Sequence, residues 1–326
     1  MGLEAITQSD AGATVVVSNR DEWREWVSAT STRNFLLQDP ILDWLDLYGE
    51  SNGFQPDFKC PGYDPATDFN RFLFEKAREF EQAVFVHVRS LTTTVTICEN
   101  FEDVQNIDKA KATFEAMKCG QKVIWQAVLW DANTRTYGVP DFLIRSDELS
   151  RLFPNILGPE EANVPARDLG KVSWHYRVVD IKYTTLDLAA GGELDNGGSS
   201  KAYKAQLYIY NRALGRYQGY LPPVSYLMGR SWKQTLKGVT SRGTTCMERL
   251  APVSHNSIFS KGRSLSVVTD EAIDWVRKIR SQGSKWTVLA NPTISELRPN
   301  MGNTQDSPWH VAKKTIAGEL AELTLL

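Results

Sequence analysis

The stretch at residues 174–188, WHYRVVDIKYTTLDL, constrains the fold more than any other part of the chain. It is rich in β-branched and aromatic residues, which favour β-strands. Successive side chains of a strand point to opposite faces, so Asp180 and Lys182 share one face and Ile181 lies on the other. The sequence therefore predicts a long strand that presents a carboxylate and an ammonium on one surface.

A second candidate carboxylate comes earlier in the chain. The apolar segments VIWQAVLW and VPDFLIR flank the turn DANTRTYG, a pattern typical of a β-hairpin. Asp141 follows Pro140 at the start of the apolar run FLI, and it lies beside Asp180 if the two strands are neighbours. Two adjacent carboxylates repel each other unless a cation lies between them. Mg²⁺, or Mn²⁺ in its place, suits such a site because it prefers hard oxygen ligands and keeps waters that become nucleophiles.

A helix is expected from Asn70 to about Val88. At about 100° per residue its apolar side chains fall in one stripe that is expected to be buried, made of Leu73, Ala77, Phe80 and Val84. Glu81 lies at the border of this stripe, whereas Glu75 and Glu79 point to water. Glu81 can therefore reach a metal held by the sheet or, equally, form a salt bridge at the surface.

A second helix is predicted over KAYKAQLYIYNRALG. Gln206 and Tyr210 are four residues apart and share a face, with Tyr203 one turn before Gln206. Tyr and Gln together can hold a phosphate or a base edge, and the alternative is a partly buried face with an aromatic anchor. The segment YLPPVSYLMGR that follows is expected to be the final strand of the core.

Composition and charge narrow the classes of protein. The chain has 326 residues, of which 42% are hydrophobic and 23% charged, as in ordinary globular proteins. Its net charge of −2 gives no overall attraction for nucleic acid, so such binding must depend on local patches. Two basic groups qualify, although a run of charge is often a solvated face. They are Lys201, Lys204, Arg212 and Arg216, and Arg230, Lys233, Lys237 and Arg242.

The cysteines and the N-terminus indicate an intracellular protein, in the cytoplasm or nucleus. Cys60, Cys98, Cys119 and Cys246 are far apart, without the spacing of a zinc site or an iron–sulfur cluster, and we interpret them as free thiols. The first residues lack the pattern of a signal peptide. No apolar run is as long as a membrane span, so no membrane association is expected.

Three segments are expected along the chain. Residues 1–68 are an N-terminal helical and loop extension, 69–250 are the core, and 251–326 are a mostly helical extension with helices at about 268–281 and 308–326. The last helix stops on LAELTLL, apolar and uncapped. We therefore expect the natural polypeptide to continue past Leu326, into further domains or a surface for protein partners.

Together, GVPDFLIR, VVDIKYTT and QLYIY resemble the RecB-type branch of the PD-(D/E)XK nucleases, relatives of the CRISPR-associated exonucleases and of the nuclease domain in bacterial recombination helicases. The resemblance covers roughly residues 70–230. It implies an α/β fold with a restriction-endonuclease-like core, in which a mixed central β-sheet is flanked by helices, with helical N- and C-terminal extensions.

The resemblance also implies roles for particular residues. Asp141 and Asp180 would hold the metal, helped by Glu81 and by the carbonyl of Ile181. Lys182 would position or deprotonate the attacking water and offset charge on the phosphate. The implied activity is hydrolysis of phosphodiester bonds in nucleic acid, with DNA favoured by the resemblance alone.

Gln206 and Tyr210 match the Q-x-x-x-Y helix that lies near the substrate strand in this family. Tyr203 and Tyr210 can stack on unpaired bases, which favours a single-stranded substrate. Members of the family often carry a four-cysteine iron–sulfur cluster, and the cysteine spacing here does not match it, so none is expected.

Two other interpretations remain open. A catalytically inactive nucleic-acid-binding or scaffold module can share the same fold, since fold does not determine chemistry. A metal-free hydrolase is disfavoured because the chain has no G-x-S-x-G motif. Its four histidines, His87, His175, His255 and His310, also lack ligand or triad spacing, and they are expected in the core or on the surface.

Overall fold

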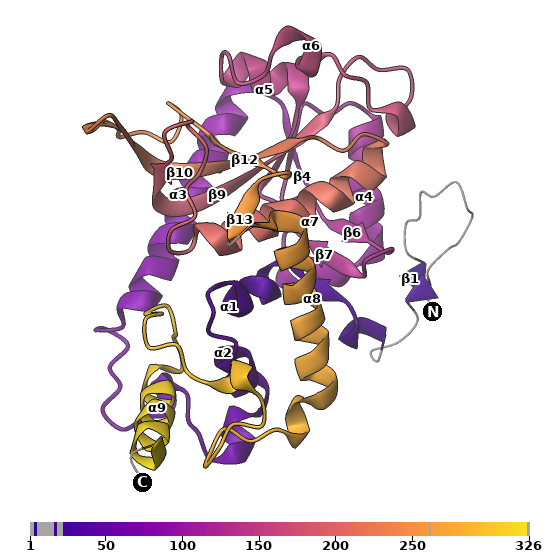
Figure 1. The fold of residues 1–326 in the computed structure, drawn as a ribbon. Coiled ribbons are helices and arrows are strands. Elements are labelled where there is room, and N and C mark those ends of the chain that lie inside the picture. Colours follow the sequence, from indigo (N-terminus) through magenta and orange to yellow (C-terminus); the bar gives the residue numbers. More distant parts are fainter. Residues whose placement is uncertain (1–2, 5–15, 18–21, 261, 325–326) are drawn as a thin grey trace.

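The structure, a computed structural model, describes residues 3–4, 16–17, 22–260 and 262–324. In this part the chain forms a mixed β-sheet with helices on both faces (Figure 1). This confirms the expected α/β class and the mixed sheet flanked by helices. The strands of the main sheet are β4 (Thr94–Thr96), β5 (Val123–Trp125), β8 (Phe142–Arg145), β9 (Tyr176–Leu188), β10 (Val224–Leu236), β11 (Val239–Gly243) and β12 (Ala251–Ser254).

The strand order in the main sheet is β11-β10-β9-β8-β5-β4, and β12 also pairs with β10. The pairs β9–β10 and β4–β5 are parallel and the other neighbours are antiparallel. The expectation that β10 is the final strand is wrong, because β11 and β12 both follow it and pair with it. β12 thus extends the sheet beyond residue 250, where the sequence suggested that the core ends.

The expected hairpin before β9 is divided between two sheets. Its outer parts, β5 and β8, pair within the main sheet, whereas its inner parts, β6 (Leu129–Asp131) and β7 (Thr136–Gly138), pair with each other. β3 (Val27–Ser28) joins β7 to complete a three-stranded sheet. The division falls at Gln126, whose φ of 52° ends β5, and before Asp141 on the other strand. The two strands therefore separate from each other next to Asp141.

The remaining regular elements are mostly helical. Short two-stranded pairs are formed by β1 (Leu3–Glu4) with β2 (Val16–Val17) and by β13 (Ile258–Ser260) with β14 (Arg263–Ser264). The α-helices are α1 (Arg33–Leu36), α2 (Ile41–Trp44), α3 (Phe69–Leu91), α4 (Ile107–Lys118), α5 (Ser146–Leu152), α6 (Pro159–Ala162), α7 (Ser200–Gln218), α8 (Leu265–Gln282) and α9 (His310–Thr324).

The two long helices α3 and α7 cover opposite faces of the sheet, and the alternation of β8 shows why. Phe142 and Ile144 belong to the buried cluster that includes α3, whereas Leu143 between them belongs to the cluster that includes α7. On β9, Val179 and Ile181 likewise face the α3 side. Each such buried side chain contributes about 1.5–3 kcal/mol. By the same alternation Asp180 points to the α7 side.

Helix α3 confirms the expected helix but not all of its buried stripe. Asp68 caps its first turn by accepting hydrogen bonds from the backbone N–H groups of Asn70 and Arg71, a contribution of about 1 kcal/mol. Val84 is buried, as expected, but Leu73 is exposed because the first turns of α3 run past the edge of the buried cluster. The sheet supports only the second half of the helix.

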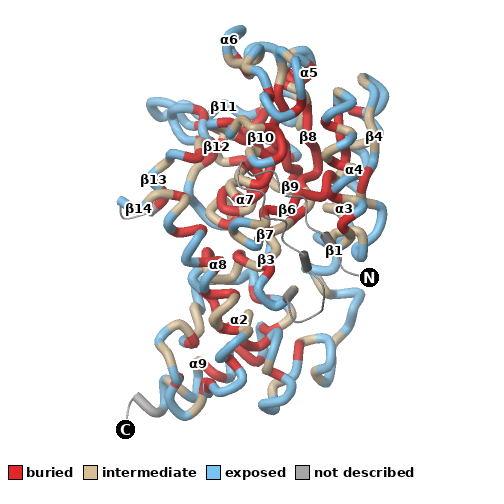
Figure 2. The backbone as a smooth tube through the Cα atoms, turned by 90° about the vertical axis from the view of Figure 1, so that its right-hand side faces the viewer, coloured by how far each residue is buried: buried red, intermediate tan, exposed pale blue. Residues whose placement is uncertain are grey.

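A helical region formed by α1, α2, α8 and α9 lies below the sheet in Figure 1. Figure 2 shows that buried segments continue from the sheet and α7 into this region. Three tryptophans connect segments of this region through hydrogen bonds from their indole N–H groups. Trp44 donates to the Gly283 carbonyl at 2.9 Å and Trp275 to Asp43 Oδ2 at 2.8 Å. Trp309 similarly donates to Asp46.

Two further findings concern membrane spans and cysteines. None of the helices in the described part of the chain is both long and apolar enough to cross a membrane. The four cysteines are free thiols. Leu47 is exposed, because α2 is followed there by a wider helical turn at residues 45–49.

Candidate active site

Asp141 and Asp180 lie opposite each other on neighbouring antiparallel strands. The ladder pairs Phe142 with Val179, and continuing it by one residue places Asp141 across from Asp180. Directly opposed residues have Cβ atoms about 4.5–5.5 Å apart. The side chain of Asp141 takes the place of a backbone acceptor between the two strands. Its Oδ2 accepts a hydrogen bond from the Ile181 N–H at 2.6 Å. The two carboxylates are therefore brought together by strand register.

Glu81 approaches the same place from α3. Its Oε1 accepts a hydrogen bond from Gln126 Nε2 at 2.9 Å, and the same nitrogen donates to Asp141 Oδ1 at 2.8 Å. The backbone N–H of Gln126 also donates to the Asp141 carbonyl at 2.8 Å. Gln126 thus links the helix to the sheet where β5 and β8 separate. Sequence reasoning missed Gln126, and the available signal was a single amide inside an otherwise apolar strand.

Lys182 completes the group. Its Nζ lies 2.5 Å from Asp180 Oδ2, and the same ammonium lies over the ring of Tyr203, 5.6 Å from the centroid. Asp180 is buried, whereas the Lys182 side chain is 22% exposed. The lysine therefore extends from a buried carboxylate towards solvent beside an aromatic ring.

The acidic groups repel one another. Burial raises the pKa of Asp141 well above its usual value, and the charges of Asp180 and Glu81 raise it further, against the opposing effect of Lys182. Burial and the charge of Asp180 also raise the pKa of Glu81. Burial lowers the pKa of Lys182, but the attraction of Asp180 and Asp141 outweighs this and raises it overall. Three carboxylates share one ammonium, so the cluster favours a further cation.

Whether a divalent cation fits depends on which carboxylate oxygens of the cluster already have partners. Among the described residues the buried Asp180 Oδ2 forms the ion pair with Lys182 but accepts no well-directed hydrogen bond. The oxygens of Asp141 and one oxygen of Glu81 are occupied by Gln126 and the Ile181 N–H. Within the described ranges no three His, Cys, Asp or Glu side chains form a ready metal site. The donor types fit Mg²⁺, and binding requires Gln126 or Lys182 to release a carboxylate.

Gln206 and Tyr210 have different surroundings from those expected. Gln206 Nε2 donates to Tyr210 Oη at 2.7 Å, so the two share a face of α7. Tyr210 is only 2% exposed, and it packs so tightly on Gly138 that a Cβ there would lie 2.3 Å from its ring. Burial raises the pKa of Tyr210 well above its usual value. In this structure the ring of Tyr210 is too buried to stack on a base, which favours the alternative of a partly buried face with an aromatic anchor.

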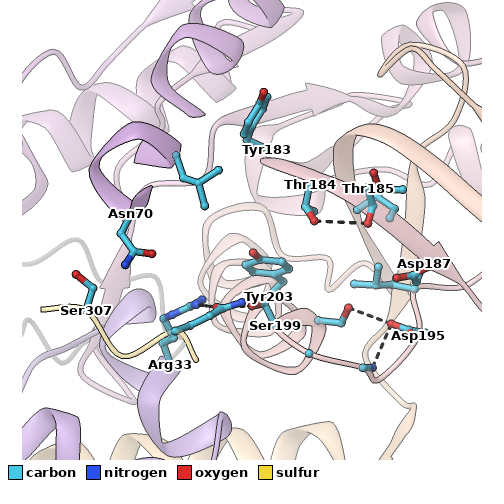
Figure 3. A pocket seen from close by; sticks show the side chains of 17 residues that line it. Arg33, Asn70, Tyr183, Thr184, Thr185, Asp187, Asp195, Ser199, Tyr203 and Ser307 are labelled. Carbon is cyan, nitrogen blue, oxygen red and sulfur yellow. Dashed lines mark hydrogen bonds between the residues drawn. The ribbon is translucent and has the colours of Figure 1, made fainter. Parts of the chain in front are cut away.

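Two hollows flank the cluster. One, of about 700 Å³, is lined by Tyr203 and also by Tyr183, Asn70 and Arg33 (Figure 3). The other, of about 840 Å³, is lined by Glu81 and Gln126 among others. We call the first the tyrosine cleft. Figure 3 shows Tyr203 projecting into its centre, between α3 and the loop that precedes α7.

One of the two basic groups noted in the sequence is not a surface patch. Lys204 is buried, and its Nζ donates to the Leu194 carbonyl and to Asn196 Oδ1, both at 2.7 Å. Arg212 forms ion pairs with Asp131 and Asp270. These cations hold α7 in place and are not available to phosphates.

Two of the histidines are core residues, as the sequence indicates. His175 Nδ1 lies 2.9 Å from the Val164 carbonyl, and His255 Nε2 lies 2.9 Å from Ser225 Oγ. Burial lowers the pKa of His175 to about 4 and that of His255 to about 3. Both are therefore neutral near pH 7.

Comparison with protein-family models and with curated proteins finds no match to this chain. Its function must be inferred from the geometry of the cluster and its surroundings.

Proposed function

We propose that the chain is a metal-dependent nuclease with a restriction-endonuclease-like core of the PD-(D/E)XK type, which hydrolyses phosphodiester bonds in nucleic acid. The observation that carries the proposal is the opposition of Asp141 and Asp180 on adjacent strands, with Lys182 on the same face of β9 as Asp180. Three chemically distinct requirements of phosphodiester hydrolysis are present together: acidic oxygens, a cation and an adjoining cleft.

The residues of the cluster would have separate roles in binding the ion and in hydrolysis. Asp141, Asp180 and Glu81 would hold the divalent ion, Mg²⁺ or Mn²⁺, and the contribution of the Ile181 carbonyl stays a prediction. When bound, the ion would supply charge neutralisation for the phosphate and activation of a water. Lys182 would position that water and offset negative charge on the scissile phosphate.

The neighbouring side chains would orient these groups. Gln126 holds Asp141 and Glu81 at a fixed separation through one amide nitrogen. Tyr210 supports Gln206 from within the core, which leaves the partly exposed Gln206 as the member of the pair able to meet substrate. Tyr203 offers a ring beside Lys182 on which an unpaired base can stack. DNA is the substrate to test first.

A nucleic-acid-binding module without activity is the second candidate. The observation that favours it is that Gln126, the Ile181 N–H and Lys182 already occupy carboxylate oxygens of the cluster. If these contacts persist when Mg²⁺ is added, the site holds nucleic acid without cleaving it.

The test combines cleavage with metal binding. Labelled single- and double-stranded DNA and RNA are incubated with the protein in Mg²⁺, Mn²⁺ or EDTA. We expect cleavage that requires the metal and is lost in Asp180→Ala and Lys182→Ala. Glu81→Gln should weaken it, whereas the matched control Glu79→Gln, which changes an exposed residue of the same helix, should not.

Metal binding has its own readout. Mg²⁺ should raise the melting temperature of the native protein, because a ligand that binds only the folded state stabilises it. The same addition should leave Asp180→Ala unchanged. Nucleic-acid binding without cleavage in every metal would favour the second candidate, and neither binding nor cleavage would refute both.

A further inference from the structure

The hairpin formed by the end of β10 and by β11 has an unusual charge. Residues 229–243, GRSWKQTLKGVTSRG, contain four cations and no acidic residue, although the whole chain has a net charge of −2. We call this segment the basic hairpin. In Figure 2 it runs out to β11 at the outer edge of the sheet region, where the chain is exposed. It is the second basic group noted in the sequence, and nothing in the proposed mechanism uses it.

The strand register shows that two of the cations, Lys233 and Arg242, share one face. Lys233 lies directly opposite Arg242, and Thr235 lies directly opposite Thr240. Directly opposed residues of an antiparallel pair project from the same face, as do alternate residues along a strand. All four are exposed. The basic hairpin therefore presents hydroxyls and cations on one side.

At the base of the basic hairpin, the opposite side is packed against the protein. Arg249 lies over the ring of Trp232, 5.0 Å from the centroid, and donates to Gln234 Oε1 at 2.9 Å. Gln234 in turn donates to the carbonyls of Ala189 and Ala190. This packing fixes which side of the hairpin faces solvent.

The polar side continues into the tyrosine cleft. On β9, Asp187 and Thr185 are the ladder neighbours of Lys233 and Ser231, and both β9 residues line the cleft. Thr185 Oγ1 and Ser231 Oγ are 2.7 Å apart, and Lys233 Nζ is 2.7 Å from Asp187. One polar sheet surface thus leads from the cleft beside Lys182 to the end of the hairpin.

Two cations of the basic hairpin are Arg242 on this surface and Lys237 in the turn between β10 and β11. No ion pair of Lys237 or Arg242 is found in the part of the chain that the structure describes. Arg230, at the base of the hairpin, lies over the ring of Tyr183, 4.9 Å from the centroid, and Tyr183 lines the cleft. Positive charge that is exposed and unneutralised favours a polyanion.

The dimensions differ between the two ends of this surface. The cleft is confined and presents tyrosine rings, which suits a few unpaired nucleotides. The hairpin is open, and its seven residues from Arg230 to Leu236 span about 23 Å at roughly 3.3 Å per residue. Duplex DNA carries one charge per roughly 1.7 Å of axis, so a ribbon of this length meets several phosphates.

We propose that the basic hairpin is an arm that binds the backbone of a duplex while the adjoining single strand enters the tyrosine cleft. The preferred substrate is then a duplex with a single-stranded tail. This inference rests on the proposed function, and it adds a substrate class to it. The alternative occupant is a second copy of the chain, paired along the β11 edge, where exposed lysine and arginine often serve to prevent such pairing.

The test uses Lys237→Ala/Arg242→Ala in the full chain. The matched control is Lys111→Ala/Lys314→Ala, which removes two exposed lysines from α4 and α9. Binding of a tailed DNA duplex, and of the tail strand alone, is measured by fluorescence anisotropy over a range of salt concentrations. Each protein carries Asp180→Asn in addition, so that the DNA stays intact.

We expect the hairpin variant to bind the tailed duplex roughly tenfold more weakly and to lose about 2 from the salt slope, because two phosphate contacts are removed. Binding of the single strand should change less than twofold, and the control should match the parent. Equal weakening for both DNAs, or none, would refute the arm. So would a change in oligomeric state, seen by ultracentrifugation, with DNA binding unaltered.

These outcomes are separable from failure of the nuclease proposal. Cleavage that depends on Mg²⁺ and Asp180 but ignores the hairpin variant would uphold the nuclease and reject the arm. Tailed-duplex binding that depends on Lys237 and Arg242, in a protein that cleaves nothing, would uphold the arm and reject the nuclease.

Discussion

The sheet region and the helical region both bury charged side chains, and they balance them in opposite ways. In the helical region Lys313 is fully buried, yet its Nζ lies 2.9 Å from Asp39 and 2.6 Å from Asp306. It also donates to the carbonyls of Asn300 and Asn303. Burial alone would raise the pKa of Asp306, but the hydrogen bonds from Lys313 and His310 hold it below its usual value.

At the cluster of Asp141, Asp180 and Glu81 in the sheet region the corresponding balance is missing. Asp141 and Glu81 have raised pKa values because burial is combined with the charge of Asp180. A buried network whose polar atoms are all matched adds rigidity, whereas an unmatched one carries a cost. Perturbed carboxylates of this kind are common at functional sites and also occur in structural ion-pair networks. The difference supports the proposal that the carboxylates serve a ligand, whereas the contacts of Lys313 stabilise the fold.

The largest expected effect comes from Asp180→Asn. Cleavage should fall by about 10³-fold or more, because a ligand of the ion is lost. The melting temperature in EDTA should stay the same or rise, since one of the repelling charges is removed. Gel-based cleavage assays and calorimetry check both. A large loss of stability would place Asp180 with Lys313, as a structural charge, and would remove the contrast between the regions.

The second effect concerns Lys313→Met. Removing the ammonium leaves Asp39 and Asp306 buried without a counter-charge, which should cost about 3–5 kcal/mol of unfolding free energy. Urea denaturation measures it. Lys314→Met, at the adjacent exposed position, is the control and should change stability by less than about 0.5 kcal/mol. Folded Lys313→Met protein should keep its cleavage rate. Loss of that rate would show that Lys313 does not serve the fold alone, against the contrast between the two regions.

Gly138→Ala tests how rigidly the sheet region holds its cluster. The added Cβ would lie 2.3 Å from the Tyr210 ring, so we expect a loss of about 1–3 kcal/mol in stability. Displacement of the nearby Asp141 should lower cleavage by roughly 10²-fold. Gly158→Ala is the control, because nothing lies near its added atom. Equal behaviour of the two variants would show that Tyr210 does not position the cluster.

Asp43→Asn tests the helical region. Asp43 is a buried carboxyl there that, unlike Asp306, has a raised pKa. Burial raises the pKa of Asp43 to about 7, although Trp275 and Asn34 donate hydrogen bonds to it. The folded state then holds a proton that the unfolded state releases near pH 4. Stability should fall by roughly 1.4 kcal/mol per unit as pH rises from about 4 to 7.

The Asn variant should lack this pH-dependent loss, so its stability relative to the native protein should increase towards pH 7. Urea midpoints at several pH values measure the difference. Parallel pH profiles for the two proteins would mean that Asp43 is ionised in the folded state, and that the helical region contains no unmatched carboxyl at this position.

The sequence predicted those site features that depend on local periodicity. Asp180 and Lys182 share a face because strand side chains alternate, and Glu81 was located by the helical period. Gln126 was missed, because its position depends on the left-handed backbone that divides one apparent strand into two. No pattern in VIWQAVLW indicates where the sheet separates.

Which side chains are buried was harder to predict than the direction in which they point. The face of α7 that carries Tyr210 is covered by the three-stranded sheet, whose existence follows from the division at Gln126. Leu73 was expected to be buried because the apolar stripe of α3 continues, but the sheet beneath it ends first. Both errors concern distant partners, which a pattern read along one element does not contain.

The bond between Lys313 and Asp39 has a consequence for how the protein is made. The two residues are 274 positions apart, so at about 5–20 residues per second the lysine is synthesised some 14 to 55 s after the aspartate. During that interval the early helices have no partner for a carboxylate that the finished fold seals from water. The early helices therefore complete their packing around Asp39 only after the segment that carries Lys313 has been synthesised.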